Sequence, residues 1–282
     1  MSVPYIINSR GEQEPFSVKK VERSARRVGA SGKLAQKISQ EIAHNVYTGI
    51  STKEIFRQVK RMLHREAPPA ALRFSLKEAM QLLGPTGFPF EQYIAEIFES
   101  WGFRIKTNQL VSGHCCSGYE IDFLAERESI LKLVECKFRQ ASQGIVQIEV
   151  ALANYARFLD IKNRFDYQKQ RKSQQEIKSL LVTNTRFSSR AIRYCECVGV
   201  ELLGWNYPKN KGLEFFIDSE GLYPVTILPS FKREWGDTFS RKGLMMVKDI
   251  LNTDPNSLGQ KLGLPVAQLR SLISEASLLL TE

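Results

Sequence analysis

Residues 118–139 read GYEIDFLAERESILKLVECKFR, and apolar and polar side chains alternate along two arms of this stretch. The first arm runs from Glu120 to Ala125 and the second from Leu131 to Phe138, with a polar connection at 126–129 between them. Alternation of this kind on either side of a polar turn predicts an antiparallel β-hairpin. We expect one face of the hairpin to be apolar and the other to carry charged side chains.

The charged face of this hairpin holds two kinds of group that suit catalysis. Its register can place Asp122 beside Glu135 and Lys137. Two close carboxylates raise each other's pKa unless a cation lies between them, and oxygen ligands of this type favour Mg²⁺ or Mn²⁺. A nearby lysine can position an attacking water, as phosphodiester hydrolysis requires. Glu120 lies on the same face as a further candidate metal ligand. The alternative is an ordinary cross-strand ion pair on a solvated face.

A helix is predicted just before the hairpin, over residues 90–101, which read FEQYIAEIFESW and are followed by Gly102. Glu91 shares the apolar stripe of that helix with Ile94 and Phe98, so its carboxylate should point toward the core. Burial of a lone charge is costly, and a metal or a lysine nearby would relieve it. A carboxylate stabilised by the helix dipole in the first turn is the simpler alternative.

With these residues the chain resembles the PD-(D/E)XK nuclease superfamily, especially its type IV restriction (Mrr-like) branch. Asp122, Glu135 and Lys137 match the D…(E/Q)xK motif, and Glu91 matches the acid on the preceding helix. The resemblance implies an α/β fold with a central α/β/α restriction-endonuclease-like core over residues 86–228. In such a core Asp122 and Glu135 would hold Mg²⁺, Lys137 would position the water, and Glu91 would complete or orient the metal shell.

The segments after the hairpin fit the same core. We expect a helix at 145–159, a buried strand at Ser179–Thr183 and a final strand at Val200–Leu203. A Thr/Asn-rich turn and a helix lie between the last two strands, which resembles the end of an Mrr-like core. Parallel strands joined by a helix would complete the three layers.

Residues 1–85 are predicted to form a separate, mainly helical domain. A short strand at Tyr5–Ile7 and a turn lead to Ser17, which suits the N-cap of a helix. Lys19 and Lys20 then fall in the first turn of that helix, where the macrodipole disfavours cations. A bound anion would explain their presence better than a structural role does.

The order of features in this domain is similar to the ATP-cone regulatory domain. The segments that carry the resemblance are SRGE, KKVERSARRVGA, GISTKEIFRQV and ALRFSLKEAM. In that family a basic-Gly turn and a lysine at a helix start contact the triphosphate, and here they match Arg10-Gly11 and Lys20, with Lys19 beside it. The family usually has Arg-Asp-Gly at the turn, whereas this chain has Arg-Gly. The resemblance implies a nucleoside triphosphate, ATP or dATP, as a regulatory ligand; a purely structural cone is the alternative.

Residues 229–282 are predicted to form a small helical domain. Asp254-Pro255 is typical of a helix start, and Gly263 precedes a second start at Leu264-Pro265. This run resembles degenerate helix-hairpin-helix domains, which bind DNA phosphates at the hairpin, here Leu262-Gly263-Leu264. The usual second glycine is missing. Helix packing or dimerisation, and hence a homo-oligomer, is an equal alternative.

The composition limits the class of binding partner that we expect. The 282 residues carry a net charge of +10 with 43% hydrophobic residues, which suits a globular protein with a polyanionic partner such as DNA. Basic residues dominate 1–85 and the segment around Lys169, Arg171 and Lys172. That segment could bind a phosphate backbone, and a solvated loop or helix face is the alternative. No apolar run approaches about 18 residues and no leader is evident, so we expect no membrane span and a cytoplasmic location.

The sequence therefore predicts a metal-dependent DNA endonuclease built from a nucleotide-responsive cone, a nuclease core and a helical tail. The alternative is a non-catalytic nucleic-acid-binding or nucleotide-sensing regulator that keeps the nuclease fold. The pair of crowded carboxylates beside a lysine favours the enzyme, because a binding module has no need of them.

Overall fold

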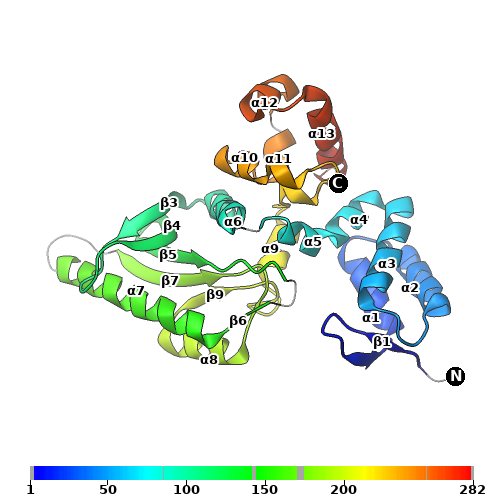
Figure 1. Ribbon diagram of the computed structural model, residues 1–282, viewed down its shortest axis with the longest axis horizontal. Helices are drawn as coiled ribbons and strands as arrows, with labels where there is room; N and C mark the ends of the chain where they lie inside the picture. Colours follow the sequence, from blue (N-terminus) through cyan, green and yellow to red (C-terminus); the bar gives the residue numbers. More distant parts are fainter. Residues whose placement is uncertain (1–2, 85, 142–143, 170–174, 252, 281–282) are drawn as a thin grey trace.

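The computed structural model describes residues 3–84, 86–141, 144–169, 175–251 and 253–280, with only the backbone described at 167–169. These residues form a mixed α/β protein with thirteen α-helices, two short 3-10 helices and a central five-stranded sheet. Figure 1 shows the sheet with its covering helices, the N-terminal helices to one side and the C-terminal helices above. None of the described helices has the length and apolarity needed to cross a membrane.

The N-terminal region is a bundle of short helices beside a small antiparallel ribbon. Ser17 begins the first helix as predicted, because its side chain accepts the N–H of Lys20. The buried side chains of residues 6–71 form a core of their own. The elements of this region are β1 (Tyr5–Ile7), β2 (Gln13–Pro15), α1 (Val18–Arg27), α2 (Gly32–Asn45), α3 (Thr52–Glu66), α4 (Pro68–Phe74) and α5 (Leu76–Gln81).

The central sheet has the strand order β3-β4-β5-β7-β9. Its first three strands are antiparallel, and the last three are parallel. A separate parallel pair, β6 with β8, lies outside it. The strands are β3 (Arg104–Val111), β4 (Tyr119–Arg127), β5 (Ile130–Cys136), β6 (Ile145–Val146), β7 (Glu176–Val182), β8 (Arg186–Phe187) and β9 (Glu201–Leu203).

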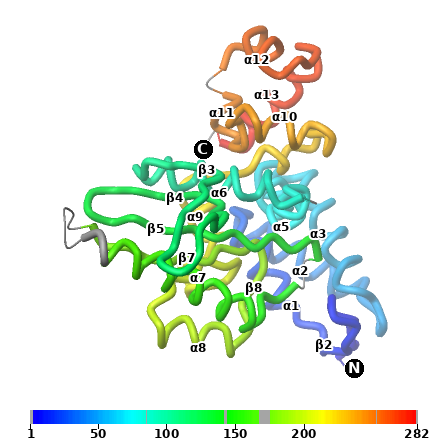
Figure 2. Tube along the Cα trace, turned by 60° about the vertical axis from the view of Figure 1, so that its left-hand side comes forward, coloured from blue at the N-terminus to red at the C-terminus, as the bar shows by residue number. Residues whose placement is uncertain are grey.

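Helices cover both faces of the sheet. On one face, α6 (Phe88–Ser100) packs against the cluster that contains Phe123 and Val134. On the other face, α7 (Ile148–Lys169) packs against Leu131 and Leu133, and α8 (Ser189–Val198) lies beside α7. Figures 1 and 2 show these layers, with the C-terminal helices on the α6 side and α8 farthest from them. The predicted hairpin strands are therefore at the centre of three layers.

The hairpin itself is tighter than predicted. Its strands pair as far as Arg127 and Ile130, so residues 128–129, not 126–129, form the connection. Glu128 has a φ of 54° there, which lets two residues close the turn. The predicted helix at 145–159 begins later and runs longer, from Ile148 to Lys169, because residues 145–146 form β6. The edge strand β3 was not predicted.

One apolar residue of the hairpin faces the unexpected side. Ile121 packs in the cluster on the α7 side, whereas Phe123 and Ala125, which share its parity, pack toward α6. Pairing of β4 with β5 begins only at Phe123, so the preceding residues are free to twist away from β5. Asn108, which would face Asp122 across β3, is unpaired and has a φ of 51°. The alternation predicted from the sequence therefore breaks at Asp122.

The C-terminal region is helical, as predicted. Asp254 accepts the N–H groups of Asn256 and Ser257 at the start of one helix, and Gly263 ends it with a φ of 66°. The elements are α9 (Leu213–Ser219), η1 (Val225–Ile227), η2 (Arg233–Trp235), α10 (Gly236–Arg241), α11 (Val247–Leu251), α12 (Pro255–Leu262) and α13 (Val266–Leu280).

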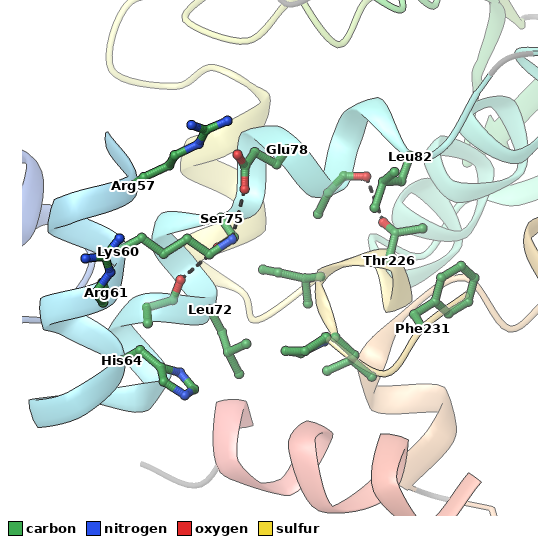
Figure 3. Close-up of a pocket in the computed structure, with 15 residues that line it drawn as sticks. Arg57, Lys60, Arg61, His64, Leu72, Ser75, Glu78, Leu82, Thr226 and Phe231 are labelled. Atoms are coloured by element: carbon green, nitrogen blue, oxygen red, sulfur yellow. Dashed lines mark hydrogen bonds and ion pairs between the residues drawn. The ribbon is translucent and has the colours of Figure 1, made fainter. Parts of the chain in front are cut away.

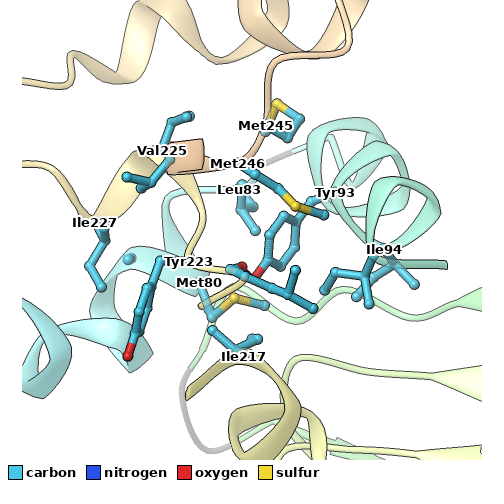
Figure 4. Close-up of a cluster of buried hydrophobic side chains, with 14 of the residues drawn as sticks. Met80, Leu83, Tyr93, Ile94, Ile217, Tyr223, Val225, Ile227, Met245 and Met246 are labelled. Atoms are coloured by element: carbon cyan, nitrogen blue, oxygen red, sulfur yellow. The ribbon is translucent and has the colours of Figure 1, made fainter. Parts of the chain in front are cut away.

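The C-terminal helices share a core with the sheet. One buried cluster joins side chains of α5, α6, the sheet and residues 213–279. Figure 4 shows its centre, where Tyr93 of α6 lies among Met80, Tyr223 and Met246. The hydroxyl of Tyr93 donates a hydrogen bond to the carbonyl of Leu222 at 2.7 Å. A boundary at 228 thus separates sequence segments that are packed together, whereas residues 6–71 keep a core of their own.

Candidate active site

The candidate site lies where the antiparallel and parallel halves of the sheet meet, at the end of β5. The Asp122 carboxylate accepts the backbone N–H of Cys136 at 2.6 Å. This bond sets Asp122 against the backbone between Glu135 and Lys137. Lys137 Nζ forms an ion pair with Glu135 Oε1. The structure thus brings together the three residues of the predicted motif.

Arg157 completes the charge balance around Glu135, and the sequence did not single it out. Its Nη2 atom lies 2.7 Å from Glu135 Oε2, on the side opposite to Lys137 in the carboxylate. The contact is an ion pair whose geometry is not that of a hydrogen bond. Oε2 is buried and has no hydrogen-bond partner among the described residues. Glu135 is only 6% exposed, which makes a counter-charge necessary. The sequence could have indicated that a buried Glu135 needs a second cation, but it does not reveal which residue of α7 provides that cation.

Glu91 approaches this cluster from the first turn of α6. Burial, followed by the charges of Asp122 and Glu135, raises its pKa to about 7. Burial and the charge of Glu135 likewise raise the pKa of Asp122 to about 6, even though Cys136 and Lys137 act in the opposite direction. The acids therefore lie close enough to repel one another, and the protein's own cations offset that repulsion only in part.

The loop after β7 holds the segment that follows Glu135. Lys137 donates its N–H to Val182 at 2.7 Å, and its carbonyl accepts from Thr183 Oγ1 at 2.7 Å. Asn184 binds both the N–H and the carbonyl of Arg139, at 2.8 and 2.9 Å. The Thr/Asn-rich turn seen in the sequence thus fixes the backbone on which Lys137 stands.

Phe138, next to Lys137, packs against the connection between the N-terminal region and α6. Its ring lies 5.8 Å from that of Phe90 between centroids, and it leaves no space for a Cβ atom at Gly84. The connection that leads out of the N-terminal region therefore touches the strand end that carries Lys137.

Glu120 does not join the acids in the way predicted. Its side chain is exposed, and the Arg157 contact at this residue is to its main-chain carbonyl, at 3.1 Å. The twist of the strand before Phe123 explains the difference, because residues 119–122 are not paired with β5. Asp122 and Glu135 are left as the two candidate metal ligands, and Glu91 approaches them from α6.

The acids fit a partly hydrated hard cation and not a complete protein cage. Within the described ranges, no three His, Cys, Asp or Glu side chains are arranged to hold a metal ion. Mg²⁺, however, usually binds through one or two carboxylates and keeps several waters. Asp122 and Glu135 offer that donor set of two carboxylates, one of which is also paired with Lys137 and Arg157. The residues present therefore fit a divalent cation.

The residues predicted to bind nucleotide are only partly brought together. Lys20 lines a cavity of about 190 Å³, together with Glu14 and Thr52. Its Nζ atom lies 3.3 Å from Glu14 Oε1. Lys19 and the Arg10-Gly11 turn do not line this cavity, although Gly11 has the positive φ of 82° that a tight turn uses.

The two predicted DNA-binding surfaces differ in what the structure describes. Arg171 and Lys172 lie outside the described residues, as does the side chain of Lys169. The turn at Leu262-Gly263-Leu264 is described, and a Cβ atom at Gly263 would meet nothing within 4 Å. The N–H groups of Gly263 and Leu264, however, both donate to the carbonyl of Gly259, so these backbone amides are already used within the protein.

Comparisons with known proteins place the chain beside an archaeal protein. The family model described as AF1548-like, C-terminal, matches residues 223–280. An uncharacterized protein of Archaeoglobus fulgidus is 36% identical over 183 residues, which are 65% of this chain and 97% of that protein. The crystal structure of the protein of unknown function AF1548 is similar with a TM-score of 0.57 and 35% identity, over 67% of this chain and 96% of that one.

Proposed function

The chain belongs to the AF1548-like family, and we propose from its site that it is a metal-dependent DNA endonuclease that hydrolyses phosphodiester bonds. One observation carries the proposal. Asp122 and Glu135 come from adjacent strands to one strand end, with Lys137 paired to Glu135 and Glu91 facing both acids. A purely structural ion pair would need one acid and one base, whereas this cluster holds three acids, two of which have raised pKa values.

Each residue of the cluster has a role in such a reaction. Asp122 and Glu135 would hold Mg²⁺ or Mn²⁺, and Glu91 would orient that shell from α6. When bound, the cation would supply Lewis-acid activation of water and neutralise charge on the phosphate. Lys137 can orient the attacking water and stabilise negative charge that develops on the phosphate oxygens. Arg157 would keep the Glu135 carboxylate ionised and in place.

The architecture supports this proposal. A sheet with an antiparallel half and a parallel half, covered by α6 on one face and α7 on the other, is similar to the α/β/α restriction-endonuclease-like core. The net charge of +10 favours a polyanionic substrate.

The test is cleavage of several forms of DNA by the purified protein with Mg²⁺ or Mn²⁺. We expect Lys137→Ala and Asp122→Asn to abolish cleavage while DNA affinity, measured in a gel-shift or anisotropy titration, stays within about twofold because binding rests on the wider basic surface. Lys132→Ala is the matched control, since Lys132 lies on the same strand and pairs with Glu201, away from the acids. Cleavage by Lys137→Ala at the wild-type rate would exclude the proposed site.

We also propose that the N-terminal region acts as an ATP-cone-like regulator that binds ATP or dATP. The cavity beside Lys20 supports this, because it offers an ammonium group, hydroxyls and an apolar floor. The contact of Gly84 with Phe138 supplies a route from the region to Lys137. Regulation requires that the nucleotide bind two states of the protein unequally.

Calorimetric titration of ATP and dATP into wild type and Lys20→Ala, with sedimentation to follow assembly, tests the regulatory role. We expect Lys20→Ala to weaken binding and Arg65→Ala, which removes a cation of α3 outside this cavity, to leave it unchanged. Nucleotide binding without any DNA cleavage would favour the alternative, a nucleotide-sensing regulator that keeps the nuclease fold without turnover.

A further inference from the structure

A second, larger cavity lies between the N-terminal helices and the C-terminal region. Its volume is about 510 Å³, within the range of roughly 300–1,000 Å³ that small-molecule sites occupy. Figure 3 shows that α3 forms one wall, α5 the back and the segment around Thr226 to Phe231 the opposite wall. It shares no lining residue with the cavity beside Lys20.

The α3 wall is cationic. It presents the cations Arg57, Lys60 and Arg61 and the imidazole of His64, and Arg57 lies three and four residues from Lys60 and Arg61. Like charges at such spacings destabilise a helix by about 0.2–0.5 kcal/mol per pair. Glu54 lies 3.4 Å from Arg57 and Glu78 lies 2.9 Å from Lys60, and these ion pairs reduce the repulsion between the cations. Arg61 and His64 make no hydrogen bond or ion pair with any side chain that the structure describes, so their N–H groups remain available to an anion.

Much of the remaining lining of the cavity is apolar. Leu72, Leu82 and Phe231 contribute to it, and Leu82 is 38% exposed although it is a large hydrophobic residue. The polar groups in this lining are already used within the protein. Thr226 Oγ1 donates to the carbonyl of Ala79 at 2.8 Å, and Ser75 Oγ donates to that of Ala71 at 2.9 Å. A ligand would therefore meet charge on one side and carbon on the other.

We propose that this cavity binds a nucleoside phosphate, with the phosphates against Arg57, Arg61 and His64 and the base and ribose against Leu72, Leu82 and Phe231. Two cations four residues apart on a helix are about 6 Å apart along its axis, which suits two adjacent phosphates. Guanidinium groups bind phosphate oxygens in pairs. The apolar wall takes the flat base, and the volume holds one nucleotide.

The site also lies where a ligand would bridge two parts of the chain. Its cationic wall belongs to the N-terminal region, whereas Thr226 and Phe231 belong to the C-terminal region. Because α5 at the back of the cavity leads to Gly84, which contacts Phe138, a nucleotide here would also hold the connection that reaches the candidate active site.

The experiment is calorimetric titration of ATP into protein that carries Lys20→Ala, so that the smaller cavity contributes little. In that background, Arg61→Gln should weaken ATP binding at least about tenfold, the loss expected for a charge-assisted contact. Leu82→Glu should do the same by placing a negative charge in the cavity. Arg65→Gln removes a cation from the same helix outside the cavity and should leave ATP affinity unchanged. All four side chains are exposed, so the variants should fold, which circular dichroism checks.

Three results would overturn the proposal. The first is equal ATP affinity in all these variants, and the second is loss of ATP binding once Lys20 is replaced. The third is that Arg61→Gln weakens binding of a single-stranded DNA oligonucleotide but leaves ATP affinity unchanged, which would make the α3 wall a nucleic-acid surface. Adenosine titrated alone separates the base from the phosphates, and Arg61→Gln should not change its binding. None of these results bears on the cleavage test with Lys137, so the two proposals fail independently.

Discussion

At the scale of single residues, the candidate site is a problem in charge balance. The buried Glu135 carboxylate is held by Lys137 on one oxygen and Arg157 on the other. Among the described residues Asp122 and Glu91 form no ion pair of this kind, and burial raises their pKa values to about 6 and about 7. A divalent cation bound near Asp122 would lower both values, so protons and metal compete for these acids.

We therefore predict that Mg²⁺ and Mn²⁺ bind more weakly as pH falls. Between about pH 8 and pH 6 Glu91 takes up a proton, and below pH 6 Asp122 follows, so metal affinity should fall by up to about tenfold per pH unit for each proton displaced. The metal-induced rise in the thermal unfolding temperature, measured at several pH values without DNA, tests this. Asp122→Asn should abolish the rise. An equal rise at pH 8 and pH 5.5 would show that these acids do not bind the metal.

Arg157 should matter for stability as well as for chemistry. We predict that Arg157→Gln lowers the free energy of unfolding by about 1–3 kcal/mol, because Glu135 stays buried with one cation in place of two. Arg157→Lys should recover part of the loss. Arg164→Gln, on the same helix, is the control, since the one hydrogen bond of Arg164 to a described residue is to the Gly113 carbonyl, at 3.4 Å. Denaturant unfolding that is the same for Arg157→Gln and Arg164→Gln would contradict the prediction.

The acids and the lysine of the site could be predicted from the sequence, because they follow from two local features. Strand alternation puts Glu135 and Lys137 on one face, and the helix stripe turns Glu91 inward. Arg157 and Asn184 could not, since their roles depend on how α7 and the loop after β7 pack on the sheet. Glu120 was wrongly grouped with Asp122, because alternation assumes a paired, regular strand and β4 is unpaired with β5 there.

At the scale of elements, the connection from α5 to α6 is the contact between the N-terminal region and the site. Most helices and central strands could be predicted from the capping residues and the apolar periodicity of the sequence, as at Ser17 and Asp254. The edge strand β3 did not, although burial alternates along it. Its half-exposed sequence carries no signal as strong as the continuous apolar runs of β5 and β7.

We predict that Gly84→Ala displaces Phe138. A Cβ atom at Gly84 would lie 2.3 Å from Phe138 Cε1, so the ring must move, and Lys137 is its chain neighbour. The free energy of unfolding should fall by about 1–3 kcal/mol, as for other overpacked sites. DNA cleavage should fall further than stability alone explains. Gly236→Ala is the control, because a Cβ atom there meets nothing within 4 Å. Unchanged unfolding and activity in Gly84→Ala would mean that this contact is not made.

At the scale of the whole molecule, the three predicted parts are not three equal cores. The first is largely self-contained, whereas the sheet and the C-terminal helices are joined by one cluster and by a polar contact inside it. Glu96 of α6 accepts the N–H of Met245, with Oε2 at 3.0 Å, and lies beside Asp249 of α11. Sequence periodicity identifies each helix but not the partner against which its apolar stripe packs, so this union could not be predicted.

This contact gives a prediction about the pH dependence of stability. Burial, and then the charge of Asp249, raise the pKa of Glu96 from 4.5 to about 8, so the folded protein holds this proton more tightly than the unfolded chain does. The contribution of Glu96 is therefore complete below about pH 4.5 and is lost as pH rises through 8. Glu91 and Asp122 act in the same direction, but over a lower range.

Glu96→Gln keeps the shape of the protonated acid and removes its titration. We predict that the free energy of unfolding of wild type, measured in urea, falls steadily from about pH 5 to pH 9. The free energy of unfolding of Glu96→Gln should fall less, so that this variant is the more stable protein at pH 9. Glu128→Gln, exposed in the hairpin turn, should follow wild type and serves as the control. If Glu96→Gln and wild type show the same slope above pH 7, then Glu96 does not hold its proton between α6 and the C-terminal helices, and the union of the two regions rests on apolar packing alone.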